Sequence, residues 1–96
     1  MTTDDRESGM RLDIYLSRTR LIMPRTAAKR ACDNGIVFVN DRVAKPGLDV
    51  HMNDLIAIRF TDQDLTVAIR KMPGKSVPKQ TADIHYEVVQ DTHYNR

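Results

Sequence analysis

The chain has 96 residues and one cysteine, which is enough for a single small domain and leaves no room for a second, catalytic domain. Hydrophobic residues make up 41% of the chain and charged residues 29%, so a core can form. The 15 basic and 13 acidic residues give a formal net charge of +2, an excess too small to indicate a nucleic-acid-binding protein by itself.

Cysteine content and the lack of long apolar segments indicate where in the cell the protein resides. Cys32 is the only cysteine and cannot form an internal disulfide, and the first residues lack the basic flank and apolar stretch of a secretory signal. Apolar runs such as residues 36–39 are four residues long, whereas a span of the bilayer needs roughly 20. We therefore expect a cytoplasmic protein with no membrane partner.

The first third of the chain predicts two helices. Residues 1–9 contain no large apolar residue except the initiator methionine and predict a disordered lead. Apolar residues then recur at helical spacing from residue 10 to 21. Pro24 suits the start of a second helix that runs to about residue 34, and Gly35 is a typical left-handed terminator.

The middle of the chain predicts four strands. Residues 36–39 are β-branched and aromatic, and residues 42–44 predict a short return strand after a turn. Residues 49–54 read as a loop, and residues 55–60 and 65–70 predict a strand pair. The expected order is therefore two helices followed by four strands.

The C-terminal part predicts a connector and one more helix. Residues 71–79 carry two prolines and three lysines, which indicates an extended basic linker. Residues 81–89 place apolar side chains at i,i+4 spacing and predict a short helix. The expected organisation is a lead at 1–9, a domain at 10–70, and a linker with a short helix at 71–96.

The positive charge is concentrated in the two predicted helices. Residues 10–32 contain six basic residues and one acidic residue, a net charge of +5, whereas residues 1–9 and 33–70 each carry −2. Five of the six are arginine, which suits bidentate contacts with phosphate. The basic residues are Arg11, Arg18, Arg20, Arg25, Lys29 and Arg30.

The start of the second helix is the predicted phosphate contact. Arg25 and Lys29 are i,i+4 neighbours near the end where backbone N–H groups and the helix dipole attract anions. Thr26 adds a hydroxyl donor, and the residues Asn40, Arg42 and Lys45 extend the surface across the turn. The alternative is an ordinary solvated charged face.

Catalytic and metal-binding patterns are absent from the sequence. The four glycines are scattered, and His51, His85 and His93 are not at metal-ligand spacing with one another or with Cys32. We therefore expect no enzyme activity, cofactor or metal. Aromatic residues make up only 5% of the chain, so binding to the backbone and shape of a structured RNA is predicted rather than base stacking.

A series of short motifs in order resembles the S4-like RNA-binding domain over roughly residues 10–60. The motifs are Arg11-Leu12-Asp13-x-x-Leu16, Arg25-x-x-Ala28, Gly35-x-Val37-x-Val39-Asn40, Val43-x-Lys45-Pro46 and Asp54-x-Ile56. The resemblance implies an α+β, αL fold in which two helices pack on a small curved sheet, with a C-terminal extension. The chain is similar to the stand-alone bacterial members, the heat-shock S4 protein and the ribosome-associated quality-control S4 protein.

The resemblance also implies partners and contacts. Such proteins bind the large ribosomal subunit while it holds peptidyl-tRNA after stalled translation, so we expect large-subunit rRNA as the partner, tRNA as a second one, and a monomeric protein. The family usually has glycine where this chain has Asp41 and Asn53, and both residue types tolerate left-handed turns. The full set of expected RNA contacts is Arg11, Arg18, Arg20, Arg25, Thr26, Lys29, Arg30, Asn40, Asp41, Arg42 and Lys45.

Two other functions remain open from the residues. A small β-grasp sulfur or protein carrier has a similar strand-ending pattern, but such carriers need a terminal Gly-Gly pair that residues 93–96 do not provide. S4-like domains often precede pseudouridine synthases, so the chain could instead assist an RNA-modifying enzyme supplied by another protein.

Overall fold

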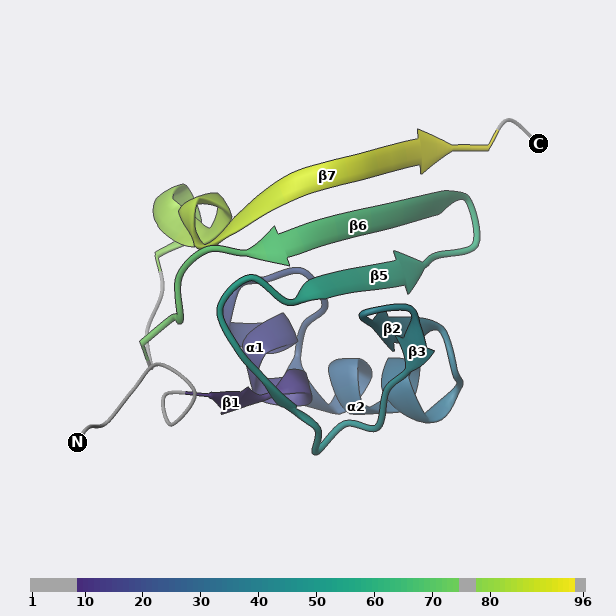
Figure 1. Ribbon diagram of the computed structural model, residues 1–96, viewed down its shortest axis with the longest axis horizontal. Helices are drawn as coiled ribbons and strands as arrows, with labels where there is room; N and C mark the ends of the chain where they lie inside the picture. Colours follow the sequence, from purple (N-terminus) through teal and green to yellow (C-terminus); the bar gives the residue numbers. More distant parts are fainter. Residues whose placement is uncertain (1–8, 75–77, 95–96) are drawn as a thin grey trace.

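The computed structural model describes residues 9–74 and 78–94 (Figure 1). The predicted disordered lead at 1–9 therefore lies outside the described residues except for Gly9. In chain order the elements are β1 Met10–Arg11, α1 Leu12–Arg18, α2 Arg25–Asp33, β2 Val37–Val39, β3 Arg42–Val43, β4 Asp49–Val50, β5 Leu55–Arg59, β6 Gln63–Ile69, the 3-10 helix η2 Lys79–His85 and β7 Tyr86–His93.

Two helices and an antiparallel sheet confirm the predicted α+β class. Five strands form the sheet in the order β3-β2-β5-β6-β7, and β1 pairs separately with β4. Figure 1 shows α1 and α2 together on one side, near β5 and the short strands, with β7 at the opposite edge. No helix among the described residues is long and apolar enough to cross a membrane.

The core joins both helices to the inner face of the sheet. Tyr15 and Leu16 of α1 are fully buried, and small residues of α2 let that helix approach the strands closely. The other large aliphatic residues that are fully buried come from α1 and from the strands. These are Leu12, Val37, Val50, Ile56, Ile58, Val67 and Ile69.

Local hydrogen bonds and backbone conformations set the end of α1 and both ends of α2. The hydroxyl of Thr19 donates to the carbonyl of Tyr15 at 2.8 Å, and Arg20 has a positive φ of 65°, so α1 ends before the predicted residue 21. α2 begins after Pro24, whose carbonyl accepts from Ala27 and Ala28. Gly35 has the predicted left-handed conformation, with φ of 76°.

The turn between β2 and β3 confirms the expected tolerance for left-handed residues. Val39 pairs with Arg42, so only Asn40 and Asp41 form the turn, and their φ values are 51° and 72°. A two-residue hairpin turn with positive φ at both positions matches the right-handed twist of its strands. Asn53 likewise has a positive φ, of 73°.

Two predictions for the strands were wrong. Residues 49–54 were expected to be loop, but Asp49 and Val50 form β4 and pair with Arg11 and Met10. β6 begins at Gln63, inside the predicted turn, because Asp64 pairs with Arg59 of β5 and Gln63 pairs with His93 of β7. The pairs of β4 with β1 and of Gln63 with His93 join segments that lie apart in the sequence, which a local pattern does not reveal.

The predicted helix at 81–89 was also wrong. The 3-10 helix η2 ends at His85, and the chain then forms β7 along β6, with Val88 opposite Val67 and Gln90 opposite Thr66. A two-turn helix is marginal in water, whereas the free edge of β6 offers a full set of backbone partners. The sheet therefore continues past residue 70, the expected domain boundary.

A buried tyrosine holds the C-terminal segment against the helices. The hydroxyl of Tyr15 in α1 donates to the carbonyl of His85 at 2.8 Å. That carbonyl also accepts from the backbone N–H groups of Arg70 and Lys71. Burial raises the pKa of Tyr15, so the hydroxyl stays protonated and remains a donor.

Candidate RNA-binding surface

A buried carboxylate organises the basic surface. Asp13, in the first turn of α1, has a side chain only 1% exposed. Arg11 donates from Nε to Asp13 Oδ1 and from Nη2 to Oδ2, both at 3.2 Å. Arg25, the first residue of α2, donates from Nε to Asp13 Oδ2 at 3.4 Å. One carboxylate thus ties the starts of both helices together.

The two guanidinium groups are fixed yet remain open to a ligand. The side chains of Arg11 and Arg25 are 46% and 54% exposed. Each guanidinium carries five N–H donors, so donors remain after these bonds to Asp13. The pair is therefore an oriented arrangement of cations of the kind that suits phosphate oxygens.

The cluster is charged at neutral pH. Burial raises the pKa of Asp13, but hydrogen bonds and attraction from Arg11 and Arg25 outweigh it and hold that pKa below its usual value. The hydrogen bond to Asp13 also raises the pKa of Arg11. Asp13 is thus an ionised anchor, and it offsets only one of the two positive charges.

The loop that carries Lys45 lies directly beside this cluster. The N–H of Asp13 donates to the carbonyl of Pro46 at 3.1 Å, and the N–H of Leu12 donates to that of Leu48 at 2.8 Å. A side chain on Gly47 would lie 3.7 Å from Arg11 Cζ, in ordinary contact. The exposed Lys45 therefore extends the cationic surface from the start of α1.

The other predicted contacts on α2 surround a separate shallow hollow. Thr26, Lys29, Arg30 and Asp33 line it, and the first three are exposed. Lys29 Nζ lies 3.5 Å from Asp33 Oδ2, in an i,i+4 pair that is exposed on both sides. Such a pair is weak and screened by salt, so Lys29 stays available to a phosphate.

The remaining arginines lie at the other end of α1. Arg18 is in the last turn of the helix and is half-buried, while Arg20 follows the helix and is exposed. Arg20 Nη1 lies 3.8 Å from Met23 Sδ. The structure thus brings Arg11 and Arg25 together on Asp13, with Lys45 on the loop that bonds to the start of α1, and leaves Arg18 and Arg20 at the far end of that helix.

The predicted contacts at and beside the β2–β3 turn lie in three different environments. Asn40 is committed to structure, because its Nδ2 donates to Asp54 Oδ1 at 3.2 Å and its Oδ1 accepts from the N–H of Leu55 at 3.1 Å. Arg42 is exposed at the start of β3. Asp41 instead lines a hollow with Ala57 and other residues of β5, β6 and β7, apart from the hollow that Asn40 and Arg42 line.

The main feature that sequence reasoning missed is the anchoring role of Asp13. Its position in the first turn suggested only a favourable interaction with the helix dipole. The spacing Arg11-x-Asp13 was the one available signal, but the approach of Arg25 depends on how the helices pack.

Comparison with known proteins places these residues in a family. The S4 domain family matches residues 10–56. An RQC P-site tRNA stabilizing factor of Streptococcus pneumoniae is 40% identical over 83 residues, covering 86% of this chain and 93% of that protein. The factor of the same name from Halalkalibacterium halodurans is 43% identical over 79 residues, covering 82% of this chain and 89% of the relative.

A solved structure agrees with the fold. The trimeric structure of heat shock protein 15 of Vibrio cholerae superposes with a TM-score of 0.77 at 27% identity, over 84% of this chain and 82% of that one. The two helices and the antiparallel sheet described above are thus shared with a solved heat-shock S4 protein.

Proposed function

We propose that this chain, which belongs to the S4-domain family of the RQC P-site tRNA stabilizing factors, binds large-subunit rRNA and P-site tRNA during quality control of stalled nascent chains. It acts as a monomeric, cytoplasmic, non-catalytic binding protein. The RNA-binding surface comprises the starts of α1 and α2 together with the exposed Lys45 and Arg42.

The observation that carries the proposal is the cluster of Arg11 and Arg25 on Asp13. A solvated charged face would leave its arginines without fixed orientation, whereas here a nearly buried carboxylate holds two of them at the starts of two helices. Lys45 lies on the adjoining loop. Fixed cations lose little conformational entropy on binding phosphate, so the arrangement favours a structured RNA.

The family match also separates the alternatives. A match of the S4 domain to residues 10–56 favours RNA binding over a β-grasp carrier. Assistance to an RNA-modifying enzyme would use the same RNA surface, but the relatives named above are stabilizing factors for P-site tRNA. Quality control is therefore the function we favour.

The test measures affinity for purified large ribosomal subunits, empty or carrying peptidyl-tRNA, across a salt series. We expect tighter binding when tRNA is present, and log K should fall by roughly 3–5 units per unit of log[salt] if about four to six phosphates are contacted. A flat salt response, or equal affinity for both kinds of subunit, contradicts the proposal.

A matched pair of double variants assigns the surface. Arg25→Ala with Lys29→Ala removes two cations from α2, whereas Arg59→Ala with Arg70→Ala removes one at the end of β5 and one just after β6. We expect roughly a tenfold loss or more only for the first pair, because each lost charge-assisted bond costs about 1 kcal/mol or more. Equal losses for both would mean that only total charge matters.

A further inference from the structure

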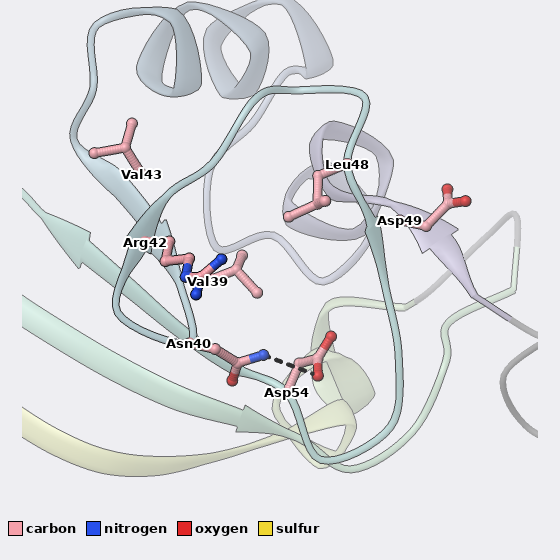
Figure 2. Close-up of a pocket in the computed structure, with 7 residues that line it drawn as sticks. All are labelled: Val39, Asn40, Arg42, Val43, Leu48, Asp49 and Asp54. Carbon is pink, nitrogen blue, oxygen red and sulfur yellow. Dashed lines mark hydrogen bonds between the residues drawn. The ribbon is translucent and has the colours of Figure 1, made fainter.

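A hollow lies next to the proposed RNA-binding surface, within the segment from β2 to the start of β5 (Figure 2). Its volume of about 500 Å³ is within the roughly 300–1,000 Å³ of small-ligand pockets. In Figure 2, Val43 and Leu48 come from different sides of this segment, with Arg42 and Val39 between them. The lining residues are Val39, Asn40, Arg42, Val43, Leu48, Asp49 and Asp54.

Its walls include aliphatic side chains that the fold leaves exposed. Val43 is 60% exposed and Leu48 is 42% exposed. Scattered exposed aliphatic residues need no explanation, but two that line one hollow offer an apolar surface to a flat ligand. A nucleobase has such apolar faces.

The hollow is preformed. Asn40 uses both ends of its amide, on Asp54 and on the N–H of Leu55, and so fixes the floor. The carbonyl of Leu48 accepts from the N–H of Leu12, and its own N–H donates to the carbonyl of Lys45. The backbone of both walls is thus tied to the body of the protein, which limits the entropy cost of filling the hollow.

Only one charged group at the hollow is uncommitted. Asp54 accepts from Asn40 and from the N–H of His51, and Asp49 interacts electrostatically with Arg11. The side chain of Arg42 makes no hydrogen bond or ion pair within the described residues. A guanidinium can stack on a base or bind its phosphate, so the free group at this site suits a nucleotide.

A short backbone segment links the hollow to the cluster of Arg11 and Arg25 on Asp13. Residues 45–48 connect them, because Leu48 lines the hollow while Pro46 accepts from the N–H of Asp13, which holds Arg11 and Arg25. An RNA backbone on the two arginines therefore passes beside the hollow.

We infer that the hollow receives one unstacked nucleobase of the bound RNA, with Val43 and Leu48 against the base and Arg42 on its stacked face or its phosphate. This inference rests on the proposed function and goes beyond it, because it adds recognition of a base to contacts with the backbone. The ligand is a bulged or looped-out nucleotide.

The experiment compares three RNA hairpins that differ at one position: fully paired, with one bulged adenosine, and with an abasic bulge at the same place. The abasic bulge keeps the bend and the phosphates but lacks the base. We expect the wild-type protein to bind the adenosine bulge about tenfold more tightly than the abasic bulge, the range for one stacked base.

Two variants test whether the side chains of the hollow produce the preference for the adenosine bulge. Val43→Ala with Leu48→Ala should reduce the ratio of the two affinities to near one and leave affinity for the paired hairpin unchanged. Val88→Ala, which truncates a valine 50% exposed on β7, is the matched control and should keep the full ratio. Urea unfolding checks that all variants fold.

The two proposals fail separately in this design. Salt-independent or absent binding of the paired hairpin and of large subunits contradicts the proposed function. Salt-dependent binding with equal affinity for the adenosine and abasic bulges contradicts only the inference that the hollow receives a nucleobase. A preference for the adenosine bulge that persists in Val43→Ala with Leu48→Ala contradicts the same inference.

Discussion

The helical end of the molecule has an excess of basic residues, whereas the β6–β7 end has equal numbers of basic and acidic residues. At the helical end, residues 10–32 carry six basic residues against one acidic residue, and that acid is buried beneath two of the arginines. At the β6–β7 end, residues 63–94 hold four basic and four acidic residues. There Arg70 pairs with Glu87 and Gln63 donates to Asp91, both exposed on the sheet.

Under the proposed function, this difference separates charge that binds RNA from charge that only keeps the protein surface soluble. Exposed pairs between neighbouring strands neutralise each other locally and contribute little to stability. A buried carboxylate beneath two half-exposed arginines instead orients their positive charge outward. The number of charges therefore says less about function than whether an acid lies beside or beneath the cations.

The largest effect should come from Asp13→Asn. Counting charges predicts tighter RNA binding, because a negative charge is removed, whereas loss of the anchor for Arg11 and Arg25 predicts weaker binding. We expect affinity for RNA to fall about tenfold and the free energy of unfolding to fall by about 1–2 kcal/mol, since bonds to a charged group are lost. Filter binding and urea unfolding measure the two effects.

Asp33→Asn is the matched control for that variant. It removes the same charge from α2 but affects only the exposed pair with Lys29. We expect equal or slightly tighter RNA binding and unchanged stability. Tighter binding by both variants would show that Asp13 acts only through its charge.

A smaller effect should come from Tyr15→Phe, which tests how the two ends are joined. The variant removes the bond to the carbonyl of His85, which still accepts from two backbone N–H groups. We expect a loss of about 1 kcal/mol of unfolding free energy. Hydrogen exchange along β7 should become faster, while RNA affinity stays unchanged.

Tyr94→Phe is its control. Tyr94 also donates a hydrogen bond, to Asp64 Oδ2 at 2.6 Å, but its side chain is exposed. Its loss should change the free energy of unfolding by less than about 0.5 kcal/mol. Equal effects of the two substitutions would mean that the buried contact does not hold the C-terminal segment.

The smallest effect should come from Asp41→Gly. Asp41 has a φ of 72° and lines the hollow on the β5–β7 side, away from the arginine cluster. The substitution gives an Asn-Gly pair, the preferred sequence for such a turn, so we expect stability to rise by about 0.5 kcal/mol. RNA affinity should change by less than about twofold, since distant exposed charges are screened. A gain of fivefold or more would place Asp41 on the RNA-binding surface.

Local patterns in the sequence determined the helices, the β2–β3 turn and the basic segment. Helical spacing, Pro24 and Gly35 act within a few residues of one another, so they predicted α2 to within a residue at each end. The concentration of arginine in residues 10–32 and the series of S4-like motifs also predicted the family, because both are properties of residue order.

Tertiary structure decided which segments pair and what each charge does. Residues 86–93 form a strand because β6 presents a free edge, and the i,i+4 pattern alone favoured a helix. Asp13 becomes an anchor only when α2 brings Arg25 beside it, and Val43 and Leu48 line one hollow only when the 45–48 loop packs on α1. Each outcome depends on contacts between residues distant in sequence, and hydrophobic burial, which is not directional, sets those contacts through the shape of the whole core.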